Sequence, residues 1–283
     1  MPTPKPHPTP GQVASIVDLL AGRRWVALTG AGLSTDSGIP DYRGPDARPT
    51  RPIQYGEFIR HADARRRYWA RSMQGYRSFG AAPPNPGHTA LAALGVPIIT
   101  QNVDGLHTAA GSTDVVDLHG LIERVACLEC GDLTPRRTLQ ERLEDANPQV
   151  TGQIPAGTAE LRPDGDADIA DPADFVVVPC LRCGGVLKPD VVFFGENVPR
   201  ERVARSYALV DAAEVLLVAG SSLTVMSGLR FARHAAKAGT PVVIVNHGAT
   251  RADELAALTV DAGTSETLTA VRAALTAPDA VGS

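Results

Sequence analysis

The sequence has few cysteines, few aromatic residues, no excess of one charge and no long apolar run. Only four of its 283 residues are Cys and 5% are aromatic, but 43% are hydrophobic, which is enough to build a proper core. Because 27 Lys and Arg nearly balance 31 Asp and Glu, the net charge of −4 provides no broad field to attract DNA or an anionic membrane. We therefore expect one large domain, or a large domain with a smaller satellite, and no nucleic-acid partner.

No window of the sequence is long and apolar enough to span a bilayer. The first residues also contain neither an apolar signal core nor an Arg-rich amphipathic helix. Residues 1–11 alternate Pro with polar residues, a composition that suits neither a helix nor a central strand. The sequence thus predicts a disordered Pro-rich tail over residues 1–11, no membrane partner and a cytoplasmic location.

All four cysteines fall into two C-x-x-C pairs, Cys127 with Cys130 and Cys180 with Cys183, and each pair is followed by Gly. Two thiolates at this spacing can bind one metal from a tight turn, and four complete a tetrahedral zinc shell without an open position. The alternatives are a redox pair or cysteines buried in a core. A redox pair needs only one C-x-x-C, and core cysteines would not repeat the same spacing, so we predict structural Zn²⁺ in a reducing compartment.

A glycine-rich turn follows a short apolar run at residues 25–28. Gly30 and Gly32 stand where a backbone that leaves a buried strand must turn sharply and approach a pyrophosphate closely. The third small position of the G-x-G-x-x-G pattern is occupied by Thr35. On its own, this turn is equally well explained by a dinucleotide site and by a tight turn without a ligand.

Four further apolar runs, like the first, break off into polar or glycine residues. They cover residues 97–100, 115–118, 215–219 and 241–245. Near-continuous apolar runs are typical of parallel strands that are covered on both faces, and residues 12–20, 88–94 and 228–238 have the apolar spacing of crossover helices. The pattern predicts an α/β fold with a Rossmann-type, doubly wound parallel sheet, whose polar strand ends converge on one nucleotide-binding crevice.

Two stretches, residues 44–86 and 121–188, do not follow this alternation. The first looks helical in its centre, and the second contains the cysteines and a long polar insertion. We predict that they form a smaller helical and zinc-binding domain, inserted into a Rossmann domain made of residues 12–43, 87–120 and 189–275. Within these stretches we interpret the arginines at 65–67 as a solvated helix face and residues 162–168 as a surface loop, because the glutamate of a calcium loop is missing.

Taken together, these motifs resemble the sirtuin family of NAD-dependent protein deacylases. The resemblance covers about residues 12–268, and its motifs occur in the family's order: residues 30–32 with 37–43, 100–107, 118–120, the two cysteine pairs, and residues 188–196, 220–222 and 245–246. The insertion between the cysteine pairs and residues 67–71 are most similar to the class II branch found in bacteria and mitochondria.

The resemblance implies that NAD lies in the Rossmann domain and an acyl-lysine protein substrate in the cleft beside it. It assigns the phosphates and a ribose to Gly30, Ala31, Gly32, Ser34 and Arg43, and the nicotinamide and its ribose to Gln101, Asn102 and Asp104. It assigns closure of the nicotinamide pocket to Ile39, Asp41 and Tyr42. The adenosine side falls to Gly220, Ser221, Ser222 and Asn246, with Ala262 as a further cofactor contact.

The mechanism implied by the resemblance makes His119 the general base, with Asn102 and Asp104 completing the catalytic set. The acyl oxygen attacks C1′ of the ribose and expels nicotinamide, His119 then activates a ribose hydroxyl, and water finally releases lysine and O-acyl-ADP-ribose. A base for this step must be neutral near pH 7, which suits imidazole. The other histidines fit packing positions (His88 and His107) or the surface (His61, His234 and His247).

The acyl group stays open at the level of sequence. Tyr68 and Arg71 lie i and i+3 on a predicted helix, and in another sirtuin branch a Tyr-x-x-Arg pair holds the carboxylate of succinyl-lysine. A surface aromatic residue and a surface cation explain the pair equally well. The resemblance places Val192 and Phe193 beside the acyl-lysine, and it pairs Gly195, Glu196 and Asn197 with the substrate backbone as an added strand.

Two other functions compete with deacylation. Protein mono-ADP-ribosyl transfer would use the same NAD site, and an inactive NAD sensor would only bind the dinucleotide. The sensor does not need a base at the ribose, so the intact set of Gln101, Asn102, Asp104 and His119 argues against it. The sequence indicates no oligomeric state.

Overall fold

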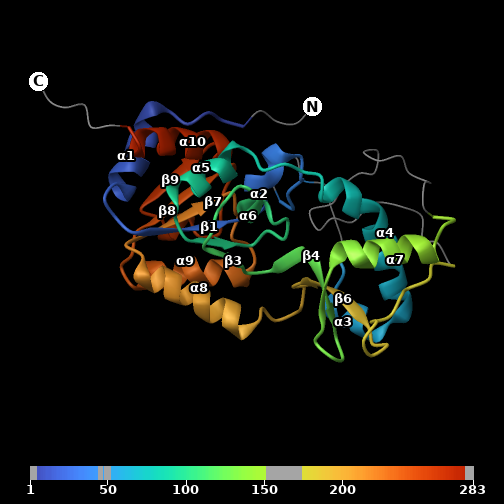
Figure 1. The fold of residues 1–283 in the computed structure, drawn as a ribbon. Coiled ribbons are helices and arrows are strands. Elements are labelled where there is room, and N and C mark those ends of the chain that lie inside the picture. Colours follow the sequence, from blue (N-terminus) through green and yellow to red (C-terminus); the bar gives the residue numbers. More distant parts are fainter. Residues whose placement is uncertain (1–4, 44–46, 48–51, 151–173, 278–283) are drawn as a thin grey trace, which may run out of the picture.

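The computed structural model describes residues 5–43, 47, 52–150 and 174–277, in which a six-stranded sheet lies beside a three-stranded one (Figure 1). The larger sheet has the strand order β3-β2-β1-β7-β8-β9, and all its neighbouring strands are parallel. Its strands are β1 (Trp25–Thr29), β2 (Ile98–Thr100), β3 (Val115–Asp117), β7 (Val215–Ala219), β8 (Val242–Asn246) and β9 (Leu258–Asp261). The predicted Rossmann-type sheet is confirmed.

Helices cover both faces of the large sheet (Figure 1). One face packs against α1 (Pro10–Leu20), α5 (Pro86–Leu94) and α10 (Thr264–Leu275), and the other against α8 (Arg200–Ala212) and α9 (Met226–Lys237). Alternate residues of β1 belong to the two separate apolar clusters that these helices close: Ala27 lies in the first and Leu28 in the second. Because both faces are buried, the central strands are apolar throughout, which made them recognisable in the sequence.

The predicted helices at residues 12–20, 88–94 and 228–238 correspond to α1, α5 and α9, within two residues at each end. Among the longer elements of the large sheet and its covering helices, α8, β9 and α10 have no counterpart in the prediction. Strand β9 is an edge strand in which only Val260 is buried, so it shows no apolar run. The continuous apolar run that identifies a central strand is absent from a strand that has one face in contact with solvent.

The prediction of a disordered tail over residues 1–11 is wrong for its described part, residues 5–11. Thr9 caps α1 by accepting a hydrogen bond from the Gln12 N–H, and Pro10 occupies a first-turn position where no N–H donor is needed. Upstream, the Pro6 carbonyl accepts from the Gly263 N–H, and Lys5 forms an ion pair with Asp36. The prolines do not prevent this attachment, because it uses carbonyl and side-chain groups that a proline-rich segment still offers.

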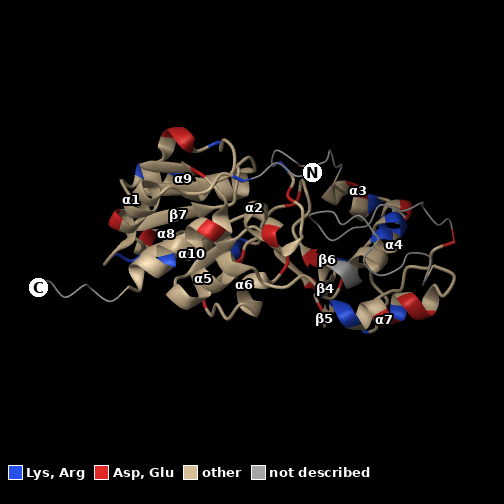
Figure 2. Ribbon diagram, turned by 90° about the horizontal axis from the view of Figure 1, so that it is seen from above, with Lys and Arg blue, Asp and Glu red and all other residues tan. Residues whose placement is uncertain are grey.

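The smaller unit combines an antiparallel sheet with helices (Figures 1 and 2). Its elements are β4 (Gly120–Cys127), β5 (Leu133–Pro135), β6 (Leu187–Val191), α3 (Tyr55–Arg60), α4 (Ala62–Phe79) and α7 (Arg136–Ala146). Phe58, Trp69 and Val125 lie in its core and are at most 1% exposed. The helical centre of residues 44–86 is confirmed, residues 162–168 lie outside the described part, and the exact domain limits stay a prediction.

The arginine run on α4 is half-buried rather than a solvated face. Arg65 donates hydrogen bonds to the carbonyls of Phe58 and Ile59 at the end of α3, and Arg67 forms an ion pair with Glu57, which is also on α3. These contacts fix the corner between α3 and α4. Elsewhere, Figure 2 shows acidic and basic residues interspersed along the helices of both units.

An ion-pair triad joins the two units. Asp190, which is on β6, accepts from Arg124 of β4 at 2.8 Å and from Arg202 of α8 at 2.9 Å. Asp190 and Arg202 are largely shielded from solvent, with side chains 17% and 22% exposed, so the attraction between them is screened less than in a surface pair. The triad links the small sheet to a helix of the large one directly beside residue 120.

Candidate active site

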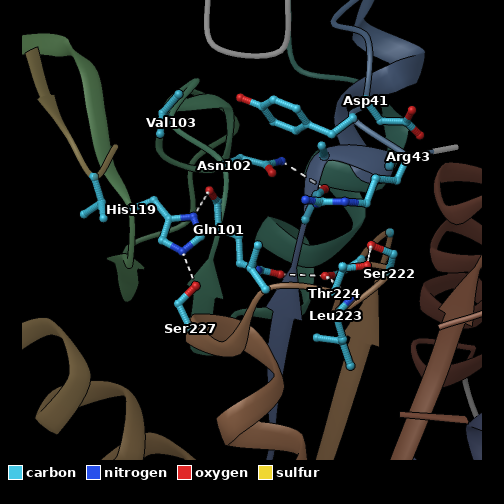
Figure 3. Close-up of a pocket in the computed structure, with 18 of the residues that line it drawn as sticks. Asp41, Arg43, Gln101, Asn102, Val103, His119, Ser222, Leu223, Thr224 and Ser227 are labelled. Carbon is cyan, nitrogen blue, oxygen red and sulfur yellow. Dashed lines mark hydrogen bonds between the residues drawn. The ribbon is translucent and has the colours of Figure 1, made fainter. Parts of the chain in front are cut away.

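A cavity of about 550 Å³ lies at the carboxyl ends of the parallel strands (Figure 3). Residues that follow β1, β2, β3, β7 and β8 line one side, and residues 191–198 at the end of β6 line another. The predicted site residues that line it are Gly30, Ala31, Gly32, Ser34, Ile39, Asp41, Tyr42, Arg43, Gln101, Asn102, Asp104, His119, Val192, Phe193, Gly195, Glu196, Asn197, Gly220, Ser221, Ser222 and Asn246. As predicted, the carboxyl ends of the parallel strands bring together segments that are far apart in the sequence.

The turns after β1 and β7 pack backbone against backbone at the floor of this cavity. The Gly32 N–H donates to the Gly220 carbonyl at 2.8 Å. A Cβ on Gly30 would lie 2.7 Å from the Cβ of Ser221 and 2.8 Å from the Gly220 carbonyl oxygen. The glycines at 30, 32 and 220 are thus required by the approach of two turns, which together present their backbone to the cavity.

Gly220→Ala is expected to lower the free energy of unfolding by about 3 kcal/mol. Gly220 has a φ of +65°, and a Cβ there would lie 2.7 Å from the carbonyl carbon of Gly32 and nearer still to the Leu33 nitrogen. Gly95 has the same φ but open space around it, so Gly95→Ala isolates the backbone strain and should cost only about 1 kcal/mol. Chemical denaturation of both variants checks this, and equal losses would contradict the packing argument.

A hydrogen-bond network orders the polar side chains of the cavity. Asn102 donates to the Gly30 carbonyl at 3.1 Å and to the Ser34 hydroxyl at 3.0 Å, and Ser34 in turn donates to Asp104 at 2.6 Å. The Ser221 hydroxyl donates to the Gln101 side chain at 2.6 Å. These amide, hydroxyl and carboxylate groups hold one another in place, which suits the binding of a sugar or an amide.

His119 is held by a hydrogen bond at each ring nitrogen (Figure 3). Nδ1 lies 2.9 Å from the Gln101 carbonyl oxygen, and Nε2 lies 2.8 Å from the Ser227 hydroxyl. A carbonyl can only accept, so Nδ1 carries the proton and the lone pair of Nε2 faces the hydroxyl. Burial lowers the pKa of His119 to about 4, although the bond to the Gln101 carbonyl opposes this shift. The imidazole is therefore neutral at pH 7 and can accept a proton at Nε2.

Two buried histidines make the fold sensitive to acid. Burial lowers the pKa of His107 to about 3 and that of His119 to about 4, from an ordinary value of 6.5. The unfolded chain binds these protons at higher pH than the folded chain, so the stability they contribute is present above pH 6.5 and is lost as the pH falls toward 4. We expect the free energy of unfolding to drop by at least about 2 kcal/mol between about pH 7 and 4.5.

Denaturant titrations at several pH values measure this loss. His107→Gln should reduce the pH dependence, whereas His61→Gln, at an exposed position, should preserve it. An unfolding free energy that stays constant over this range in the wild-type protein would show that neither imidazole is held neutral by folding.

The remaining histidines partly follow the predictions. His88 and His107 are buried and packed ring edge against ring face with centroids 4.8 Å apart, which confirms their packing role. The interpretation of His247 as a surface residue is wrong: it is half-buried, lines the cavity and lies 3.1 Å from Asp261. His247 directly follows Asn246 at the end of β8, so its place after a strand end could have predicted that it lines the cavity.

Residues at the start of α9 line the cavity but were missed. Ser227 and Arg230 come from its first turns, and Thr224 and Met226 lie just before or at its beginning. The sequence shows an apolar run that ends at residue 219, and these positions lie several residues beyond it. Their common signal is the beginning of a helix after a strand end, where N–H groups and side chains face the same crevice.

Three predicted site residues do not line the cavity. Ala262 is fully buried in the apolar core with α1, α5 and α10, so the side chain offers no surface to a cofactor. Tyr68 is 4% exposed and packs against Phe193 with ring centroids 5.3 Å apart, behind the cavity wall. Arg71 is half-buried on the same helix. An anion-binding role for Tyr68 and Arg71 stays a prediction without support from this geometry.

The segment after β6 is tied to both units. The Val192 N–H donates to the His119 carbonyl at 2.8 Å, and the Phe194 carbonyl accepts from the Tyr55 N–H at 2.8 Å. Glu196 accepts from the Phe193 N–H at 2.8 Å and pairs with the buried Lys188 at 2.9 Å. The segment after β6, which turns at Gly195, is thus fixed along the wall of the cavity.

The four cysteines form a separate cluster at the far end of the small sheet. Their Sγ atoms all lie within 4.8 Å of one another, and none of the four residues lines the cavity. Gly131 and Gly184 close the two turns with φ of +69° and +76°, and each donates its N–H to the first Cys of its pair. Four thiols in this arrangement fit one tetrahedral Zn²⁺ with no open coordination position, which is typical of a structural site.

A model of the Sir2 family matches residues 30–227, which span the glycine turn, the cysteine pairs and the start of α9. The chain belongs to the Sir2 family. Among its relatives, the NAD-dependent protein deacetylase 1 of Streptomyces coelicolor is 55% identical over 280 residues, covering 95% of this chain and 92% of the relative. The NAD-dependent protein deacetylase 1 of Mycobacterium avium is 54% identical over 259 residues, covering 89% and 92%.

Solved structures of Sir2 proteins share the fold. One described as "Sir2-p53 peptide-NAD+" has a TM-score of 0.71 at 30% identity, over 90% of this chain and 94% of that chain. Another, "Sir2 bound to acetylated peptide", has a TM-score of 0.72 at 28% identity, over 90% and 95%. The predicted sirtuin resemblance is confirmed, while the class II branch stays a prediction. Among the described residues, no helix has the length and apolar character needed to cross a membrane.

Proposed function

We propose that this chain is an NAD-dependent protein lysine deacetylase. Its Sir2 relatives at 55% and 54% identity are NAD-dependent protein deacetylases by name, and related structures contain NAD+ with a p53 peptide or an acetylated peptide. The observation that carries the proposal is the neutral imidazole of His119 in the same cavity as the glycine turn and the Asn102 network. A protein that only bound the dinucleotide would have no use for a proton acceptor there.

The residues of the cavity fit NAD. The glycine turns at 30–32 and 220 bring backbone close enough for phosphate contacts, and the hydroxyls and amides of Ser34, Asn102 and Asn246 match ribose hydroxyls. When bound, NAD supplies nicotinamide as the leaving group and a ribose that receives the acyl group. Asp104, fixed by Ser34, would offer its carboxylate to positive charge on the ribose of bound NAD.

His119 takes the proton from a ribose hydroxyl at Nε2. Its Nδ1–H bond to the Gln101 carbonyl fixes the tautomer and leaves this single acceptor site on the ring. Because burial holds the pKa at about 4, the ring is unprotonated over the whole neutral range, so its Nε2 lone pair is present at pH 7.

The segment 192–197 is the part of the chain that would receive the substrate. Val192 and Phe193 give it an apolar wall, and Gly195 and Asn197 also line the cavity. An extended peptide can add to such a segment through main-chain hydrogen bonds, so the acylated lysine is positioned with little demand on flanking side chains.

The test is incubation of an acetyl-lysine peptide with NAD labelled in its ADP-ribose part. We expect deacetylated peptide and labelled O-acetyl-ADP-ribose in equal amounts, with nicotinamide released only when peptide and NAD are both present. Label on protein instead would favour mono-ADP-ribosyl transfer, and binding of NAD without turnover would favour the sensor.

A parallel panel of longer and dicarboxylic acyl peptides with Arg71→Ala tests the acyl preference. The anion-pocket hypothesis requires that this variant loses activity selectively on dicarboxylic peptides.

A further inference from the structure

The first turn of α9 contacts the imidazole of His119 from the side opposite Gln101. Ser227 is the second residue of this helix, and its hydroxyl lies 2.8 Å from Nε2 (Figure 3). Ser227 is half-buried and lines the cavity, as does His119. The nitrogen that must accept a proton in the proposed reaction is therefore already hydrogen-bonded to a side chain of the chain itself.

The chemistry of this contact is fixed by the other ring nitrogen. Nδ1–H donates to the Gln101 carbonyl, so Nε2 has a lone pair and the Ser227 hydroxyl is the donor. A serine hydroxyl can turn about its C–O bond, and it offers two acceptor lone pairs besides its one proton. The same group can thus donate to the neutral ring and accept from the protonated one.

Burial makes the protonated ring costly unless its Nε2–H finds a hydrogen-bond acceptor. An imidazolium at this depth has lost most of its hydration, and Arg202 adds repulsion from the large unit. Leaving a buried charged donor without an acceptor costs much more than leaving a neutral one. An adjacent hydroxyl that reverses its direction removes part of this cost at the moment when the proton arrives.

We propose that Ser227 is a positioning residue for His119, which keeps Nε2 directed at the cavity in the neutral ring and accepts from Nε2–H after the ring has taken the ribose proton. As the ribose hydroxyl approaches Nε2, the Ser227 hydroxyl turns its proton away from the Nε2 lone pair. The ribose O–H bond then breaks, its electron pair goes into the bond between the ribose oxygen and the acyl carbon, and the Nε2–H bond forms, while Ser227 keeps its own proton throughout. This inference rests on the proposed function, because it assigns the proton acceptor of that reaction to Nε2.

The neighbouring residue supports the same arrangement. A Cβ on Gly228 would lie 2.6 Å from the side-chain nitrogen of Gln101, so a larger residue there would displace the Gln101 side chain. The backbone of Gln101 holds Nδ1, and the first turn of α9 packs against its side chain. The ring thus lies between Gln101, which follows β2, and Ser227 of α9, and Gly228 packs against the Gln101 side chain.

The experiment compares Ser227→Ala with Ser227→Thr, which retains a hydroxyl, and with Ser15→Ala, which removes an exposed helical hydroxyl far from the cavity. Deacetylation of an acetyl-lysine peptide gives kcat and the KM for NAD. NMR of the cofactor-free protein, labelled with ¹⁵N-histidine and assigned with His119→Gln, reports the protonation and hydrogen bonding of each ring nitrogen.

We expect Ser227→Ala to lower kcat about 10-fold to 100-fold, as for the loss of one hydrogen bond to a charged group, with little change in the KM for NAD. Its Nε2 resonance should move downfield, because a lone pair without a donor is deshielded. Ser227→Thr and Ser15→Ala should keep both the wild-type kcat and the wild-type spectrum.

Three results would overturn the proposal: a wild-type kcat in Ser227→Ala, an unchanged Nε2 resonance, or a threonine variant as impaired as the alanine one. A loss confined to the KM for NAD would also overturn it, since Ser227 would then contact the co-substrate itself. A wild-type protein that does not deacetylate at all would refute the proposed function instead, and the spectra would still decide whether Ser227 holds His119.

Discussion

His119→Ala is expected to lower kcat/KM for NAD-dependent deacetylation by about 10³-fold, within the range that general bases contribute. The variant removes the imidazole that burial keeps neutral and that the Gln101 carbonyl orients at the cavity, and alanine offers no acceptor in its place. The fold should survive, because the hydrogen bond from the Val192 N–H to the His119 carbonyl does not depend on the imidazole. Coupled assays of peptide and nicotinamide measure the loss.

The matched control is His61→Ala, which removes an exposed imidazole outside the cavity and should retain full activity. Calorimetric titration with NAD should show binding by both variants, since the glycine turns and the Asn102 network are intact. A His119→Ala enzyme with wild-type turnover would place the base elsewhere and would remove the main argument for the proposed reaction.

Cys180→Ser is expected to abolish stoichiometric zinc binding and to lower the free energy of unfolding by at least about 4 kcal/mol. Cys180 is 5% exposed and belongs to the apolar core of the small unit, and its Sγ lies 3.9 Å from that of Cys130. Without the metal, three thiols would be left close together, and the turns that precede β5 and β6 would lose the crosslink between them. Metal analysis and thermal unfolding measure both effects.

Leu181→Ser serves as the control, because it changes the same turn at a residue that is 75% exposed and offers no ligand. It should keep one zinc per chain and near wild-type stability. Deacetylase activity should fall in Cys180→Ser through β6, which pairs with β4 and leads into the segment 192–197. A stable, zinc-free Cys180→Ser protein with full activity would show that the cluster has no structural role.

The central strands and the site at their ends could be predicted because one physical rule governs both. A strand buried on two faces is apolar over its whole length, and the first polar residue after it must face the crevice, as Gln101, His119 and Asn246 do. The cysteine pairs were equally clear, since their spacing restricts them to one turn each. In these places local sequence and tertiary arrangement require the same residues.

The rest could not be predicted because it depends on contacts that local patterns do not encode. Strand β9 and helix α10 meet solvent on one side, and residues 5–9 are held by Gly263 and Asp36 from distant parts of the chain. The i and i+3 spacing of Tyr68 and Arg71 predicts a shared helix, which α4 confirms. The sequence does not show, however, that Tyr68 packs inward against Phe193. Likewise, no pattern indicates that Ser227 reaches His119.

The triad of Asp190, Arg124 and Arg202 has a mechanical consequence for substrate entry. It pins the small sheet to α8 directly beside Gly120, whose neighbour is His119. If the cleft widens to admit a long polypeptide, the rotation must pivot near this pin, so displacement grows with the lever arm toward the cysteine cluster and is smallest at the imidazole. The mouth of the cleft can therefore open while Nε2 of His119 keeps its position and direction.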